Sequence, residues 1–263
     1  MPSVSNIARD NDEKIITVVG NGKSLKDFDF ELLKNKEWVG CCLGFRHWEI
    51  TGIYPTHYVC VDNVICKHHR YKILDMIKNK KCKSFVLCAS IYHTDIKDEL
   101  MKYESVYTIQ ELVLSDENPF RYLVDFCSGT TSVLYAYILS STKINLLGMD
   151  CQYVEFLPEC IENEDGSLTI TEKIKDNPNY YFNEYQQVGD IYNKPNVEKV
   201  HKKSWWDLRN TIMLFNILRQ AKIEVFNYNL KDNIELDEYF VKLDINDYEL
   251  GLEAPLNGQC NKN

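Results

Sequence analysis

Short, continuous apolar runs alternate with helix-like stretches through the first two thirds of the chain. A strand that a parallel sheet buries on both faces is apolar throughout, whereas a half-exposed strand alternates apolar and polar residues. Repeated alternation of such runs with helices is typical of βαβ units, so the sequence predicts an α/β fold with a single Rossmann-like, doubly wound and mostly parallel sheet. The predicted strands are residues 15–19, 38–43, 57–62, 84–88, 105–108, 144–149 and 223–226, and the predicted helices are residues 27–35, 68–78, 95–103 and 130–141.

The segment 151–200 departs from this pattern because it is polar, contains prolines and carries aromatic residues without regular spacing. A long irregular insertion in a compact domain is usually a functional lid or a small subdomain. We therefore expect a core over residues 1–150, an aromatic-rich lid insertion over 151–200, a helix and strand completing the core over 201–230, and an acidic tail over 231–263. Acids outnumber lysines in the tail, which is expected to be loosely attached or partly disordered.

Composition argues against several classes of protein. The formal net charge is −9, so the chain as a whole would repel nucleic acid and anionic lipid. None of the ten cysteines forms a Cys-x-x-Cys motif, and several lie in apolar runs, as reduced cysteines of intracellular proteins do. No apolar stretch approaches the ~20 residues that a membrane-spanning helix needs. We expect a cytoplasmic protein without a nucleic-acid partner or a membrane span, and the sequence leaves a homo-oligomer open.

A glycine-rich turn, Gly20-Asn21-Gly22, follows the first predicted strand. Glycine lets a phosphate approach the backbone N–H groups of a strand-to-helix turn, where the helix dipole is positive. The turn lacks the third glycine of the dinucleotide fingerprint and the Gly-Lys-Ser/Thr order of a P-loop, so neither NAD nor ATP follows from it. A phosphate site and an ordinary tight turn both stay open. If the turn holds a nucleotide, Gly22→Val should weaken nucleotide binding far more than it weakens the fold.

A second group of small residues, Ser128-Gly129-Thr130, stands at the start of the predicted helix 130–141. Such residues donate main-chain and side-chain hydrogen bonds, which suits a phosphate, a ribose or a carboxylate. Taken alone, the group is explained more simply as an ordinary helix cap. Asp150 ends the next predicted strand, at the carboxyl edge of the sheet, where open α/β folds bind their ligands.

His201 differs from the other five histidines because it lies between the aromatic insertion and an amphipathic helix that Ser204 is expected to cap. A histidine there could take a proton from an acceptor hydroxyl, since its unperturbed pKa is near ~6.5. An exposed histidine that merely precedes a helix is the plainer interpretation, and from the residues alone it is favoured.

Cys66, His68 and His69 stand close together in the sequence but do not predict a metal site. Adjacent histidines point in different directions on a helix, and no second pair of ligands has matching spacing. From the sequence, therefore, no metal ligands are predicted.

Four motifs together resemble the bacterial sialyltransferases of glycosyltransferase family 42 and the wider set of proteins like them. The motifs are Val19-Gly20-Asn21-Gly22-Lys23-Ser24-Leu25, Cys127-Ser128-Gly129, Leu147-Gly148-Met149-Asp150 and a late histidine before a helix. The resemblance spans about residues 15 to 223. It implies a metal-independent, inverting glycosyltransferase that moves a sugar from a CMP-sugar donor to a glycan acceptor and requires no further cofactor.

The resemblance also implies roles for individual residues. His201 would be the general base, and tyrosine hydroxyls would stabilise the departing phosphate in place of a cation. The residues assigned to the donor and its nucleotide are Gly20, Asn21, Gly22, Asp62, Asn63, Ser128, Gly129, Thr130 and Asp150. Those assigned to the leaving phosphate are Tyr153 with Tyr180 or Tyr181, and those assigned to the acceptor and lid are Tyr185, Gln187 and Asp190.

Two positions depart from the family, since Leu43 and Asp62 stand where it carries asparagine. A carboxylate at Asp62 would repel a phosphate or a sialic acid carboxylate unless it bonds a hydroxyl, so a neutral sugar on UDP or GDP is an alternative donor. Two other functions also stay open. One is a magnesium-dependent nucleotide or pterin pyrophosphotransferase, for which no well-placed carboxylate pair is visible. The other is a non-catalytic nucleotide- or carbohydrate-binding protein, in which His201 would be dispensable.

Overall fold

The computed structural model describes residues 13–113, 127–150, 157–194, 205–229 and 236–249. Their centre is an eight-stranded sheet in which every neighbouring pair of strands is parallel, in the order β11-β10-β6-β1-β2-β3-β4-β5. The strands are β1 (Ile15–Val19), β2 (Trp38–Cys41), β3 (His57–Cys60), β4 (Ser84–Leu87), β5 (Val106–Thr108), β6 (Lys143–Leu147), β10 (Glu224–Asn227) and β11 (Val241–Lys242). The predicted Rossmann-like parallel sheet is confirmed, and each predicted strand is present.

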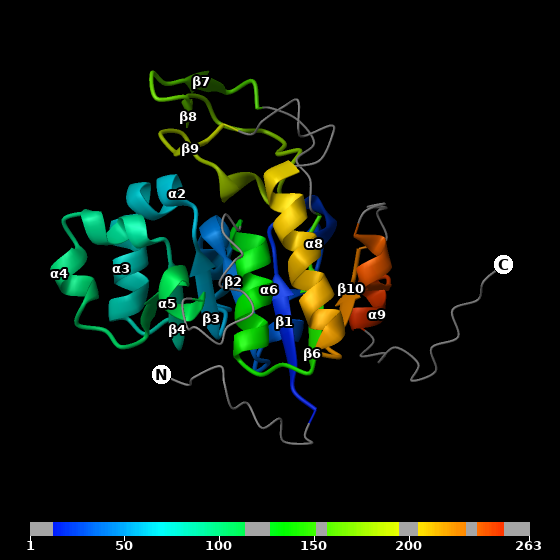
Figure 1. The fold of residues 1–263 in the computed structure, drawn as a ribbon. Coiled ribbons are helices and arrows are strands. Elements are labelled where there is room, and N and C mark those ends of the chain that lie inside the picture. The colour runs from blue at the N-terminus through cyan, green and yellow to red at the C-terminus, as the bar shows by residue number, and fades with distance from the viewer. Residues whose placement is uncertain (1–12, 114–126, 151–156, 195–204, 230–235, 250–263) are drawn as a thin grey trace.

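Apolar side chains bury both faces of the central strands. The residues of β2, β3 and β4 are all buried, and Trp38, Tyr58 and Phe85 are among the largest side chains fully withdrawn from solvent. Helices α6 and α8 lie side by side over one face (Figure 1). The helices are α1 (Phe45–Thr51), α2 (Asn63–His68), α3 (Arg70–Lys78), α4 (Lys97–Leu100), α5 (Ile109–Val113), α6 (Ser128–Ile138), α8 (Trp205–Gln220) and α9 (Ile245–Glu249).

The helix predicted over residues 27–35 is wrong. Two short 3₁₀ segments, Lys23–Leu25 and Phe30–Leu33, replace it. Asp27 and Asn35 have φ values of 71° and 64°, and this left-handed conformation cannot continue a right-handed helix. Among the described residues, no helix is both long and apolar enough to cross a bilayer.

The chain reverses its direction of travel across the sheet between β1 and β6. From β1 it proceeds through β2 to β5, whereas from β6 it proceeds to β10 and β11 on the other side. Ligands of open α/β sheets bind at the carboxyl ends of the strands where the order reverses in this way. The turns after β1 and β6 therefore define the candidate site.

The insertion contains a three-stranded antiparallel sheet that the sequence did not predict. Its strands are β7 (Cys160–Glu162), β8 (Ser167–Ile170) and β9 (Ile191–Asn193). Leu157, Ile170 and Ile174 form a small apolar cluster separate from the main core. The small sheet lies next to α2 (Figure 1). Its movement as a lid stays a prediction, as does the division of the chain into four parts.

Part of the acidic tail belongs to the folded core. The strand β11 pairs with β10 at the edge of the large sheet. Leu236 and Tyr248 are buried, and the Tyr248 hydroxyl lies 3.1 Å from Thr17 Oγ1. The expectation of a loosely attached tail is wrong for residues 236–249, because scattered apolar residues anchor an otherwise acidic segment.

Candidate functional site

The turns after β1 and β6 pack directly on each other. The N–H of Gly20 donates to Leu147 O (2.8 Å), and the N–H of Gly22 donates to Gly148 O (2.9 Å). A Cβ on Gly20 would lie 2.3 Å from Gly148 O, and one on Gly22 would lie 2.3 Å from the Asp150 Cγ. The glycines are thus required by the close approach of these two turns, whatever the turn binds.

Asp150 is held within the protein. Its carboxylate accepts hydrogen bonds from the N–H of Ser24 (3.1 Å), from the Ser24 hydroxyl and from Asn229 Nδ2 (3.1 Å). A valine at Gly22 would displace this carboxylate, so Gly22→Val damages the local structure as well as any nucleotide site. The expectation that it would weaken nucleotide binding more than it weakens the fold stays a prediction, and these contacts make the variant a poor test of it.

Gly20→Ala is expected to lower the free energy of unfolding by about 2–3 kcal/mol, because its methyl group meets backbone that cannot rotate away. Gly129→Ala is the matched control. A Cβ on Gly129 comes close only to the flexible end of Met149, at 2.9 Å from Cε, and lies in ordinary contact with Cys127 Sγ at 3.7 Å, and alanine favours a helix over glycine. Urea denaturation of both variants measures the difference, and equal stabilities would contradict the packing argument.

Part of the insertion lies against the turn after β1. Gly22 and Tyr180 form an antiparallel bridge, and the N–H of Tyr181 donates to Asn21 O (3.2 Å). Lys23 Nζ donates to Asn177 O (2.6 Å) and pairs with Asp176 Oδ1 (2.9 Å). The structure therefore brings two predicted leaving-phosphate tyrosines beside the predicted donor turn.

Tyr181 is enclosed by aromatic rings. Its ring stacks on Phe30 with 5.4 Å between centroids and packs edge-on against His47 at 5.1 Å. Its hydroxyl is buried, and no hydrogen-bond partner for it is found in the described part of the chain. Burial raises the pKa of Tyr181, so the hydroxyl stays protonated and can donate a hydrogen bond. Tyr180 instead stacks on Tyr185 at 3.7 Å.

The start of α6 lies at the carboxyl end of β3. Cys127 caps the helix by accepting the N–H of Thr130, and the N–H of Val61 donates to Ser128 Oγ (3.0 Å). Thr130 Oγ1 lies 2.9 Å from Thr211 Oγ1. Within the described residues no acceptor is found for the N–H groups of Ser128 and Gly129. These two amides are therefore the donors that the helix start offers to a ligand.

Asp62 has a structural role in addition to the one predicted for it. Its Oδ1 accepts the N–H groups of Val64 and Ile65 at the start of α2, and its Oδ2 accepts Asn193 Nδ2 (2.9 Å) from β9. Burial raises the pKa of this carboxyl. Asn63 is the exposed first residue of α2. The donor-binding role of both residues stays a prediction.

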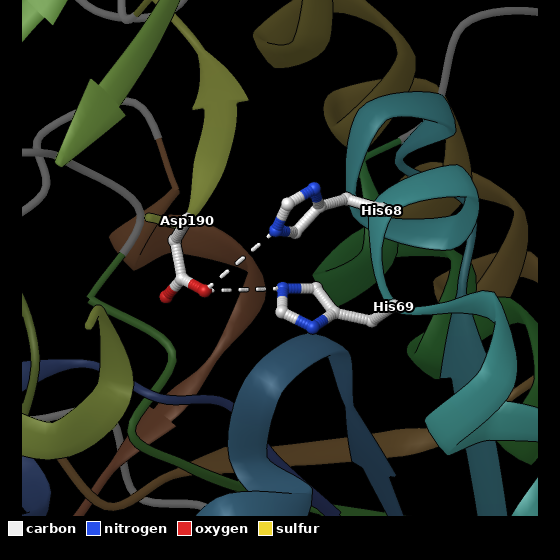
Figure 2. Close-up of side chains that lie close together, drawn as sticks. All are labelled: His68, His69 and Asp190. Carbon is white, nitrogen blue, oxygen red and sulfur yellow. Dashed lines mark ion pairs between the residues drawn. The ribbon is translucent and has the colours of Figure 1, made fainter. Parts of the chain in front are cut away.

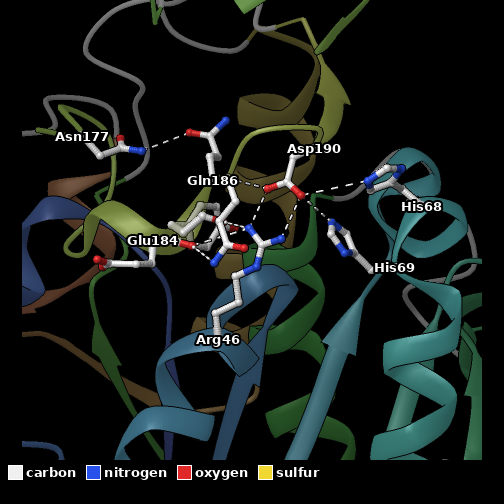
Figure 3. A network of polar contacts seen from close by, with 9 residues as sticks. Arg46, His68, His69, Asn177, Glu184, Gln186 and Asp190 are labelled. Carbon is white, nitrogen blue, oxygen red and sulfur yellow. Dashed lines mark hydrogen bonds and ion pairs between the residues drawn. The ribbon is translucent and has the colours of Figure 1, made fainter. Parts of the chain in front are cut away.

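Asp190 fastens the insertion to the core through Arg46, a residue that sequence reasoning missed (Figure 3). Arg46 Nη1 lies 2.6 Å from Asp190 Oδ2 and Nη2 lies 2.8 Å from Oδ1, and the two side chains are 12% and 7% exposed. Arg46 Nη1 also donates to Tyr185 O (2.7 Å). The exposed Gln187 contributes its N–H, which donates to Asp190 Oδ2 (2.7 Å). Three predicted acceptor-site residues are thus organised around one arginine.

His68 and His69 both lie against Asp190 (Figure 2). Sequence reasoning assumed that one helix would point them apart. The helical segment is interrupted at His69, where α2 ends and α3 begins with φ −99° and ψ 18°. That assumption is wrong, and only knowledge of the interruption could have corrected it. His201 and Tyr153 lie outside the described residues, and their roles stay predictions.

This fold is shared with known glycosyltransferases. No protein-family model matches the sequence. A search of curated proteins by sequence likewise found no match. The monofunctional α-2,3-sialyltransferase Cst-I from Campylobacter jejuni superposes with a TM-score of 0.52 at 14% identity, covering 98% of this chain and 90% of that chain. The MAf glycosyltransferase from Magnetospirillum magneticum AMB-1 gives 0.50 at 15% identity, covering 91% of this chain and 36% of that chain.

At such low identity the comparison concerns the fold. The sialyltransferase CST-II in complex with a trisaccharide acceptor and CMP has a TM-score of 0.47 at 14% identity, over 89% of this chain and 88% of that chain. The superpositions on Cst-I and on the MAf glycosyltransferase show that the chain has a Rossmann-type fold of the kind that those two proteins adopt.

Proposed function

We propose that this protein is a glycosyltransferase that moves a sugar from a nucleotide-sugar donor to a glycan acceptor. The proposal is carried by one observation, the gathering of ligand-binding groups at the carboxyl edge beside the β1–β6 reversal. The two amides of Ser128 and Gly129 are hydrogen-bond donors there without an acceptor among the described residues. The Tyr181 hydroxyl, on the segment that lies against the turn after β1, is a further donor for which no acceptor is found among those residues, and its ring is enclosed by aromatic rings. Donors fixed in this way suit the phosphate of an activated sugar.

The proposed chemistry is an inverting transfer without a required metal. His201 deprotonates the acceptor hydroxyl, and the hydroxyl attacks the anomeric carbon as the bond to the phosphate breaks. Tyr153, with Tyr181 or Tyr180, stabilises the charge on the departing phosphate by donating hydrogen bonds. Tyr185, Gln187 and Asp190 shape the acceptor side of the insertion.

The donor is proposed to be a CMP-sugar, following the motif resemblance, with UDP- and GDP-sugars as alternatives. Asp62 bears on this choice. Both of its oxygens accept hydrogen bonds from helix and insertion groups, and no cation among the described residues pairs with it to offset its charge. Such a charge favours a donor whose nearest group is a hydroxyl over one whose nearest group is a carboxylate.

The two competing functions have less support. A magnesium-dependent pyrophosphotransferase would use several carboxylates at one point, and the group of potential ligands found among the described residues contains only one. A non-catalytic binding protein would share the donor site but would not consume a sugar nucleotide. Release of free nucleotide in the presence of an acceptor distinguishes it from an enzyme.

Thermal unfolding with CMP, UDP, GDP and their sugars, each with and without Mg²⁺, tests the proposed donor class. A nucleotide at a hundred times its Kd should stabilise the protein by about 2.7 kcal/mol. We expect one nucleotide family to do so without Mg²⁺. Stabilisation that requires Mg²⁺ would favour the pyrophosphotransferase. If none of these nucleotides stabilised the protein, the proposed donor site would be contradicted.

Gly129→Ala tests the helix start directly. The variant should fold at least as well as the wild type, because alanine stabilises a helix relative to glycine. Its methyl group should keep a phosphate from the amides, and losing one hydrogen bond to a charged group weakens nucleotide affinity by about tenfold or more. Isothermal titration calorimetry with the stabilising nucleotide measures this change, and unaltered affinity would place the phosphate elsewhere.

A further inference from the structure

Two imidazoles and one carboxylate converge where the insertion meets the core. His68 Nε2 lies 4.0 Å from Asp190 Oδ1, and His69 Nε2 lies 3.6 Å from the same oxygen. The three ligand atoms lie within 4.8 Å of one another. Figure 2 shows both rings turned toward the carboxylate from the junction of α2 and α3.

These distances are too long for hydrogen bonds, whose heavy atoms lie at about 2.7–3.2 Å. The distance from His69 is close to the separation of about 3.3 Å between ligand atoms of a tetrahedral ion with bonds of 2.0–2.1 Å, and the longer distances of the cluster, up to 4.8 Å, would have to shorten when an ion binds. His69 Nε2 is buried, and no hydrogen-bond partner for it is found among the described residues. A buried polar atom without a partner is costly, and a shared ion would satisfy it.

We propose that His68, His69 and Asp190 bind a transition-metal ion, with Zn²⁺ as the ion that best fits this set of ligands. The imidazoles and Asp190 Oδ1 supply three of its bonds, and a fourth position is left for water. This inference does not depend on the proposed sugar transfer.

The surroundings hold each ligand in place. Asp190 Oδ2 accepts Arg46 Nη1 and the N–H of Gln187, while Oδ1 accepts only Arg46 Nη2 among the described residues, so Oδ1 keeps a lone pair for an ion (Figure 3). The ring of Phe45 packs against His69 with 5.9 Å between centroids. His68 is exposed, so its side chain can rotate to shorten its distance. Outer partners of this kind orient metal ligands.

The charges select the class of ion. Arg46 offsets the single carboxylate, so the site lacks the cluster of anionic oxygens that Mg²⁺ or Ca²⁺ prefers. Neutral imidazoles bind Zn²⁺, Co²⁺ and Ni²⁺.

The ion would join the segment before β9 to the α2–α3 junction. Asp190 belongs to the insertion, whereas both histidines belong to the core. Asn193 and Asp62 already link the same two regions. A bound ion would therefore restrain the insertion over the carboxyl edge of the sheet, and its role would be structural.

Zinc titration of the protein, in competition with a chromogenic chelator, tests the site. The protein should be reduced and carry no histidine tag. We expect stoichiometric binding that weakens by about tenfold to a hundredfold or more in His68→Ala and in His69→Ala. His93→Ala is the matched control, since His93 is an exposed histidine outside the cluster, and it should bind as the wild type does. His68→Gln replaces His68→Ala if circular dichroism shows that the alanine variant is misfolded.

Co²⁺ absorption separates this site from the cysteines. Imidazole and carboxylate ligands give d–d bands without the near-ultraviolet charge transfer of a thiolate. Zinc should also slow amide hydrogen exchange over residues 183–193 in the wild type and not in His69→Ala. Equal zinc affinity in wild type and both histidine variants, or thiolate charge transfer with Co²⁺, would overturn the proposal and leave an ion-paired network without a metal.

Discussion

Asp190→Ala is expected to lower the free energy of unfolding by about 3–5 kcal/mol, because it leaves the Arg46 guanidinium buried without its carboxylate. The pair is bidentate and largely withdrawn from solvent, which separates it from the ion pairs on the surface. The measurement is urea denaturation in buffer with a chelator, so that metal binding does not contribute.

Asp176→Ala provides the control. Asp176 also belongs to the insertion and pairs with a cation of the core, Lys23, but its side chain is 83% exposed. Solvent screens such a pair, and its loss should change stability little. Equal losses of stability in the two variants would show that burial does not make the Arg46–Asp190 pair more important for stability than the exposed pair.

A double variant separates two contributions to the free energy of unfolding, namely the penalty for leaving Arg46 buried and unpaired and the net stabilisation by the ion pair. Replacing a buried ion pair with apolar residues of similar size is often neutral or stabilising. Arg46→Met combined with Asp190→Leu should therefore recover most of the stability that Asp190→Ala loses. Failure to recover it would show that the hydrogen bonds from Arg46 to Tyr185 O and from the N–H of Gln187 to Asp190, which the double variant also removes, contribute substantially.

The sheet could be predicted because its determinants are local. Each central strand must be apolar on both faces, and this requirement is visible in a run of four or five residues. The strands β7, β9 and β11 were missed because their residues are partly or fully exposed and form no such run. The strand β8 is mostly buried, but hydroxyl residues alternate with its apolar residues, so it forms no apolar run either. The helix predicted over residues 27–35 failed because left-handed residues at Asp27 and Asn35 interrupt it.

The candidate site was predictable only in part. Its glycines and small residues mark turns at strand ends, and the alternation of strands and helices places those turns at one edge of the sheet. The contact between Arg46 and Asp190 joins residues 144 positions apart, and no local sequence pattern predicts it. The two histidines were visible, but their convergence depends on a helix interruption at His69 and on the position of Asp190. Such contacts are properties of the packed chain.

The proposed sugar transfer requires a general base, and the choice of His201 for this role rests on the proposed function. An inverting transfer needs one group that removes the acceptor proton as the bond forms. His47, a described histidine near Tyr181, is a poor choice because it is packed between Phe30, Tyr181 and Phe182 and burial lowers its pKa. His201, which precedes the long helix in the sequence, is the proposed base.

His201→Ala should reduce the rate of sugar transfer by about 10²–10⁴-fold, which is the usual contribution of a positioned general base. Nucleotide affinity should change little, because binding is assigned to amides and tyrosine hydroxyls that the substitution does not touch. The assay follows nucleotide released from the stabilising donor in the presence of acceptor, with His93→Ala as the control and calorimetry for affinity. If the variant lost activity and nucleotide binding together, His201 would be part of the binding site. If it turned over at the wild-type rate, the proton would have to leave through another group.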